Sequence, residues 1–166
     1  MNHMLSGKDT LKRLWNHFSF SLDSISERVR FQKTIYLLSK IGFPNLEAYE
    51  RSFKMYLYGP YSPELAKDAF DLIESKDIPT ESISFSDEES IALTLFSDLI
   101  GALPKYEGRP LYAPYELLSD IIYWTSSEPA ISNEDLFERI KNKKPYFNSR
   151  SEFDVAFDLL TEKGLI

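Results

Sequence analysis

The sequence contains no cysteine, only two histidines and only six glycines among its 166 residues. Without cysteine the chain has no disulfide, no cysteine-ligated zinc or iron–sulfur site and no thiol nucleophile. No glycine falls in the spacing of a dinucleotide-binding or phosphate-binding loop. The longest apolar run has four residues, far below the roughly 20 that cross a bilayer. The sequence therefore predicts no membrane span, and the lack of cysteine fits the reducing cytoplasm, where we expect this protein.

Catalytic patterns are also scarce. Any histidine-dependent triad would rest on His17, and no GxSxG serine elbow accompanies it, so a surface position is expected for this residue. Glu74-Ser75-Lys76 is the nearest match to a nuclease-type metal motif, but it ends a helical pattern instead of lying on a strand. An enzyme would need carboxylates that converge from separate helices. We therefore expect no catalytic residue, no metal and no cofactor.

The composition predicts a packed domain, because 43% of the residues are hydrophobic and 14% are aromatic. The periodicity predicts a mainly α fold with a small β-hairpin or short two-stranded sheet. We expect one domain over 1–166, with a helical part at 1–80 and a second helical part at 81–166. The last two helices are compatible with a winged-helix-like unit.

Helices are predicted at about 8–18, 26–41, 62–73, 86–103, 115–125, 133–141 and 151–163. Strands are predicted at 52–58, where Gly59-Pro60 ends the alternation, and at 83–85. Helix starts are marked by Ser62 followed by Pro63, and by a capping box that begins at Ser86. A loop rich in glycine and proline is expected at 105–113.

Charge is distributed unevenly. Nineteen basic and twenty-six acidic residues give a net charge of −7. Residues 61–137 carry four basic and sixteen acidic side chains, whereas residues 1–60 carry nine basic and five acidic ones. On the helix at 26–41, three basic residues lie within roughly 80° of one another and predict a basic stripe. The candidate nucleic-acid contacts are Arg30, Lys33, Lys40, Lys143, Lys144 and Arg150. The alternatives for these basic residues are a solvated surface and a binding surface for an acidic protein partner.

Asp87, Glu88 and Glu89 form a dense acidic run within the acidic region. They are a candidate binding surface for a basic protein partner. The simpler alternative is the solvated first turn of a helix, where carboxylates complement the positive end of the helix dipole.

The most specific string in the sequence is a motif turn that links a strand to a helix. Its glycine can adopt positive φ and its two prolines fix φ near −65°. One interpretation is a rigid corner buried by two tyrosines. The other is an anion site at the helix N-terminus, against which Glu64 counts because its carboxylate already occupies the first turn. The motif turn consists of Tyr58, Gly59, Pro60, Tyr61, Ser62, Pro63, Glu64 and Leu65.

The motif turn follows a helix whose residues 30–38 read Arg-Phe-Gln-Lys-Thr-Ile-Tyr-Leu-Leu. Together these segments resemble the YwgA-like proteins of bacteria and archaea and, more loosely, the Panacea or SocA-type antitoxin domain. The resemblance covers residues 30–72, and its helix positions are Phe31, Gln32, Lys33 and Tyr36. Panacea domains usually carry a tryptophan shortly before the Gly-Pro pair, where this chain has Tyr56.

The resemblance implies a mainly helical and non-catalytic domain, since SocA-type domains neutralise toxins by binding them or adapt them to a protease. We therefore predict a protein-interaction module, an antitoxin or regulator whose partner is a protein, with a toxin as the leading candidate. The alternative is a winged-helix-like DNA-binding transcription regulator. Oligomeric state is not predicted by any pattern in the sequence.

Overall fold

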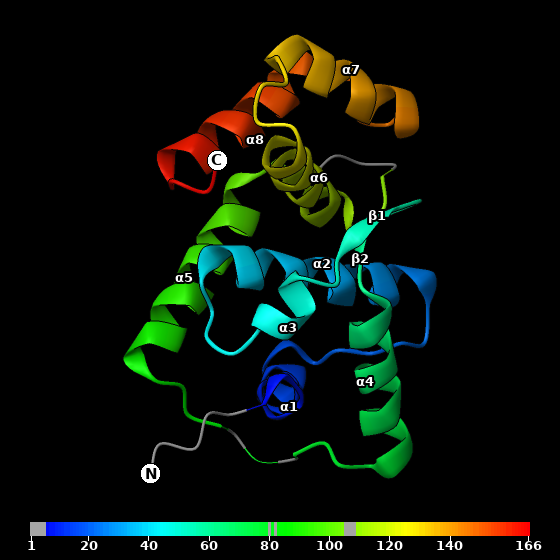
Figure 1. Ribbon diagram of the computed structural model, residues 1–166, viewed down its shortest axis with the longest axis vertical. Coiled ribbons are helices and arrows are strands. Elements are labelled where there is room, and N and C mark those ends of the chain that lie inside the picture. The colour runs from blue at the N-terminus through cyan, green and yellow to red at the C-terminus, as the bar shows by residue number, and fades with distance from the viewer. Residues whose placement is uncertain (1–5, 80, 82, 105–108) are drawn as a thin grey trace.

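The structure is a computed structural model that describes residues 6–79, 81, 83–104 and 109–166. Over these residues it is mainly helical with one small antiparallel sheet, which confirms the predicted fold class. Figure 1 shows the arrangement. The elements are α1 (Gly7–Phe18), α2 (Ile25–Ile41), α3 (Glu47–Glu50), β1 (Lys54–Tyr56), β2 (Gly59–Tyr61), α4 (Pro63–Ser75), α5 (Asp87–Ala102), α6 (Ala113–Ser127), α7 (Asn133–Lys143) and α8 (Arg150–Glu162).

Helix α2 is the central element, and it crosses the middle of the molecule in Figure 1. Helices α3, α5 and α6 and strand β2 all pack against it. As a result every residue from Phe31 to Ser39 is buried, including polar ones. The predicted basic stripe on this helix is therefore wrong at Lys33. Neighbouring elements cover α2 on several sides, whereas the prediction assumed that one face met solvent.

Strands β1 and β2 form a hairpin with the register Lys54↔Tyr61, Met55↔Pro60 and Tyr56↔Gly59. The predicted strand at 52–58 is too long, because the chain turns at Leu57 and Tyr58 and returns as β2. Gly59 and Pro60 belong to that second strand and do not end the sheet. Pro60 pairs with Met55, which is the middle pair of the three. In antiparallel strands hydrogen-bonded and non-hydrogen-bonded pairs alternate, and this middle pair is of the second kind. The missing N–H of Pro60 therefore costs no hydrogen bond between the strands.

The helix starts agree with the sequence signals. Ser62 caps α4 ahead of Pro63, and Ser86 and Glu89 form the capping box of α5. Gly42 ends α2 in the left-handed conformation, with φ of 105°. The strand predicted at 83–85 is wrong, since these residues pair with no other strand of the described structure.

The C-terminal part consists of α6, with α7 and α8 packed against it. Residues 109–166 contain helices and connecting segments without a strand, so the winged-helix detail is not confirmed. The loop predicted at 105–113 lies partly outside the described residues, which resume at 109. Among the described residues, no helix is both long and apolar enough to span a bilayer.

Candidate functional site

The motif turn is fixed to α2 by Gln32. The Gln32 side chain donates from Nε2 to the backbone oxygen of Ser62 (3.0 Å), and its Oε1 accepts from the Ser62 N–H (2.9 Å). Ser62 Oγ in turn accepts from the N–H of Leu65 at 3.0 Å. Both side chains are buried. Because these N–H groups already have protein partners, the geometry favours the rigid corner over the anion site, although Tyr58 at its edge is exposed.

Lys33 reaches the same turn from the next position of α2. Its Nζ donates to the backbone oxygen of Pro60 at 2.6 Å, and the side chain is only 1% exposed. Burial lowers the pKa of Lys33 to about 7, because desolvation disfavours the ammonium form more than the nearby Asp120 carboxylate favours it. Lys33 of the motif helix is thus an interior amine held against the hairpin.

A second lysine joins this interior region from the segment after α7. Lys144 Nζ lies 2.8 Å from Glu116 Oε2 and 2.6 Å from Asp120 Oδ2, and all three side chains are buried. Tyr146 donates its hydroxyl to Glu116 Oε1. We call these residues with Lys33 the Lys144 cluster: Lys33, Glu116, Asp120, Lys144 and Tyr146.

The two carboxylates of the Lys144 cluster lie four residues apart on one face of α6. Burial raises the pKa of both Glu116 and Asp120, and the ammonium of Lys144 opposes this rise by favouring their charged forms. Asp120 Oδ1 is buried and has no hydrogen-bond partner among the residues that the structure describes. The cluster therefore depends on Lys144 for its charge balance.

Gly59 lets the hairpin approach this cluster closely. Its φ is 99°, a conformation that L side chains rarely adopt. A Cβ atom there would lie 2.6 Å from Asp120 Oδ1 and 3.1 Å from Lys33 Cε. Two separate constraints therefore require glycine at position 59. Its backbone conformation disfavours any other residue, and the Lys144 cluster fills the space that a side chain would need.

The buried amine of Lys33 predicts a pH dependence of stability. Because its folded pKa of about 7 lies below the ordinary lysine pKa of 10.5, the unfolded chain binds this proton more tightly between those pH values. The contribution of Lys33 to the free energy of unfolding therefore rises with pH across that window, by at most about 1.4 kcal/mol per pH unit. We expect Lys33→Met to remove this rise. Urea unfolding of both proteins at several pH values measures it, and parallel pH profiles would contradict the prediction.

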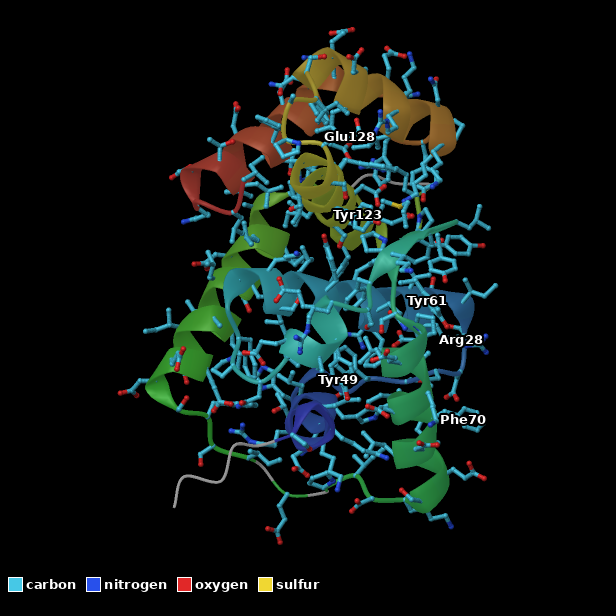
Figure 2. The ribbon with its side chains drawn as sticks, viewed as in Figure 1. Arg28, Tyr49, Tyr61, Phe70, Tyr123 and Glu128 are labelled. Atoms are coloured by element: carbon cyan, nitrogen blue, oxygen red, sulfur yellow. The ribbon has the colours of Figure 1, made fainter. Side chains whose placement is uncertain are left out.

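An apolar groove lies on the other side of Lys33, between the first half of α2 and the hairpin. It encloses about 350 Å³, within the range of ligand pockets. Tyr56 and Tyr61 pack edge to face in its wall, with ring centroids 5.2 Å apart. In Figure 2, Arg28 and Tyr61 lie on the side of the molecule that carries the hairpin. We call this the hairpin groove: Ile25, Arg28, Val29, Gln32, Lys33, Tyr56, Leu57, Tyr58, Gly59 and Tyr61.

The candidate nucleic-acid contacts do not form one basic face. Lys33 and Lys144 are buried, so neither can reach a phosphate backbone, and for these two the prediction is wrong. Their burial follows from packing on α2 and α6, which the periodicity did not reveal. Three others form ion pairs: Arg30 with Glu27, Lys40 with Glu50, and Arg150 with Glu134 and Asp154. Lys143 is exposed. Contact with nucleic acid by these four residues stays a prediction.

The candidate acidic surface is smaller than predicted. Asp87 and Glu88 are exposed at the start of α5, but Glu89 is buried. Glu89 closes the capping box and receives Arg13 Nη2 at 2.9 Å, so it is a structural residue. The ion pair with Arg13 and the hydrogen bond to Ser86 lower the pKa of Glu89.

The remaining isolated candidates also have structural places. His17 is exposed near the end of α1, as expected. Lys76 of the Glu74-Ser75-Lys76 string is the left-handed C-cap of α4 and is exposed. Within the described ranges, no three histidine, aspartate or glutamate side chains lie close enough to hold a metal ion.

Sequence reasoning missed Glu116, Asp120 and Tyr146. One signal was present: Glu116 and Asp120 lie four residues apart amid Leu117, Leu118 and Ile121, so two carboxylates share a helix with a run of large apolar residues. Such a pair on a buried helix needs a cation, and no local pattern identifies Lys144 as that cation.

The comparisons with known proteins support part of the resemblance. No family model matches the chain, and no solved structure matches it. The Panacea or SocA-type part of the resemblance is not confirmed. The chain is similar along nearly its whole length to the uncharacterized protein YwgA of Bacillus subtilis (strain 168), with 29% identity over 167 residues that cover 90% of this chain and 93% of that protein.

Proposed function

We propose that this protein is a non-catalytic interaction module that binds a partner protein through the hairpin groove and its rim. The observation that carries the proposal is the exposure of large apolar side chains around one cavity. Leu57 at the hairpin turn is 70% exposed, and Ile25, Tyr56 and Tyr58 around the same groove are exposed as well. Clustered exposed apolar side chains are typical of interaction surfaces.

The hairpin that presents this surface is held firmly. Gln32 and Lys33 bind the backbone of Ser62 and Pro60 from one side, and the Lys144 cluster lies against Gly59. A rigid support lowers the conformational entropy that is lost on binding. The motif residues, on this proposal, position a binding surface and do not act on a substrate.

A toxin is our candidate partner, because residues 30–72 resemble the Panacea or SocA-type antitoxin domain. The exposed Asp87 and Glu88 lie within the strongly acidic middle of the chain and supply negative charge for a basic partner. On this proposal the partner arrests growth when it is produced alone, and co-production of this chain restores growth.

A photo-crosslinking residue at position 57 tests the proposed surface. Ile91 on α5 is the matched control, because it is 71% exposed and lies away from the hairpin groove. We expect a discrete crosslinked protein from position 57, in cells of the source organism, that position 91 does not give. Identification of that protein by mass spectrometry supplies the purified partner for binding measurements.

With the purified partner, Leu57→Asp is expected to weaken binding at least tenfold, because an apolar side chain that is buried on binding contributes about 1.5 to 3 kcal/mol. Ile91→Asp is expected to leave the affinity unchanged within about twofold. Circular dichroism checks that both variants fold. Equal crosslinking at the two positions, or equal affinities of the two variants, would refute the proposed surface.

A further inference from the structure

The hairpin groove has an unusual charge for this protein. Arg28 is the one exposed basic side chain among the described residues that line it, because Lys33 is buried and its Nζ is bonded to Pro60. None of these described lining residues is acidic. The protein as a whole carries a net charge of −7. The amide of Gln32 is already bonded to Ser62 and the amine of Lys33 to Pro60, so Arg28 is the polar group of α2 that is left for a ligand in this groove.

Arg28 uses one N–H group, that of Nε, in a hydrogen bond to a described residue. Its Nε donates to the backbone oxygen of Leu22 at 2.8 Å, and among the described residues no carboxylate lies within ion-pair distance of its guanidinium. Its neighbour Arg30, in contrast, pairs with Glu27 at 3.2 Å. A guanidinium with free terminal N–H groups at the rim of an apolar hollow is suited to bidentate binding of a carboxylate.

Strand β1 pairs with β2 alone in the described sheet, so the other edge of β1 carries no strand. Met55 and Pro60 are the middle pair of the register, and Pro60 has no N–H, so this pair exchanges no hydrogen bonds across the hairpin. In an antiparallel pair this alternation points the N–H and C=O of Met55 away from β2. An extended segment can therefore form main-chain hydrogen bonds at Met55.

From these features we infer that the hairpin groove binds an extended segment of a partner protein that carries a large apolar side chain next to a carboxylate. The apolar side chain fills the cavity, and the carboxylate binds Arg28. A protein segment is favoured over a small free acid, because exposed Ile25 and Leu57 extend the apolar surface beyond the cavity. This inference rests on the proposed function, since it names the chemistry of the partner at the same surface.

Four fluorescent peptides of one length test this inference. In a glycine–serine background, they carry tryptophan flanked by two aspartates, tryptophan flanked by two asparagines, tryptophan flanked by two lysines, and alanine flanked by two aspartates. Fluorescence anisotropy at about 50 mM salt measures their affinities, since screening is weak there. We expect the aspartate–tryptophan peptide to bind at least tenfold more tightly than each of the others.

Arg28→Gln is expected to reduce the affinity of the aspartate–tryptophan peptide to that of its asparagine counterpart. Arg51→Gln is the matched control, because Arg51 is also exposed, lies outside the groove and has no ion pair with a described residue. The control variant is expected to bind as the unaltered protein does. Both substitutions are at surface positions and keep the fold, which thermal melting checks.

Equal binding of the aspartate and asparagine peptides, or an unchanged affinity in Arg28→Gln, would overturn the inference. So would competition by free indole-3-acetate at the same concentration as the peptide, because the occupant would then be a small acid. If no peptide binds but position 57 still crosslinks a partner, this inference fails and the proposed function stands. If the peptide binds as expected and position 57 gives no discrete crosslink, the proposed function fails instead.

Discussion

Lys144→Met is expected to lower the free energy of unfolding by about 3 to 5 kcal/mol. The lysine supplies the cation for Glu116 and Asp120, at 2.8 and 2.6 Å, and all three side chains are buried. Methionine keeps much of the volume but removes the charge, so two carboxylates remain in a medium of low dielectric. Equilibrium unfolding in urea, followed by intrinsic fluorescence, measures the change.

Two controls separate charge balance from packing. Lys141→Met removes a lysine whose Nζ lies 3.9 Å from Glu138 at the surface, and we expect a change within about 0.5 kcal/mol. Adding Asp120→Asn and Glu116→Gln to Lys144→Met removes the uncompensated charges and is expected to restore part of the lost stability.

The cost of Lys144→Met should also depend on pH. Burial already raises the pKa of Glu116 and Asp120, and loss of the lysine raises both further. These carboxyls therefore take up protons in the folded variant at a higher pH than in the unfolded chain, and the destabilisation becomes smaller as the pH falls. A cost that is small, or that stays constant on acidification, would show that the cluster does not depend on Lys144.

Gly59→Ala is expected to lower the free energy of unfolding by about 3 kcal/mol or more, through two separate effects. Its φ of 99° is strained for alanine, and the new Cβ would lie 2.6 Å from Asp120 Oδ1. Asp120 cannot move aside cheaply, because its other oxygen is held by Lys144 at 2.6 Å.

Gly42→Ala provides the matched control for this substitution. Gly42 has a similar φ of 105°, but a Cβ there would meet nothing within 4 Å. We expect this variant to show the backbone effect alone, about 1 to 2 kcal/mol. The difference between the two alanine variants therefore isolates the steric effect of the Lys144 cluster, and equal losses in urea unfolding would contradict our account of Gly59.

Local signals in the sequence predicted most helix boundaries. The side chains of Ser86 and Glu89 each accept the other residue's backbone N–H within one turn, and Gly42 ends α2 because it can adopt the left-handed conformation. These effects act over a few residues, so a single sequence displays them. The hairpin was only half predicted, because Gly59-Pro60 is a common turn signal and its role as β2 depends on pairing with β1.

The candidate site was predicted less completely because it is assembled from distant segments. The motif turn contains Gly59 and the helix before it contains Lys33, but the residues that these two contact lie on α6 and after α7. Lys144 was assigned to a basic surface because a lysine beside other charged residues is usually solvated. Only the packing of α6 against α2 and β2 turns it into an interior counter-ion.

The Lys144 cluster has a consequence for the order of events during synthesis. The ribosome releases the chain from its N-terminus, so α2, the hairpin and α6 emerge before Lys144, which follows Asp120 by 24 residues. Until then the two carboxylates of α6 lack the ammonium of Lys144, and without it they favour water over the interior. We therefore expect docking of α6 onto the hairpin to be completed only after Lys144 has emerged.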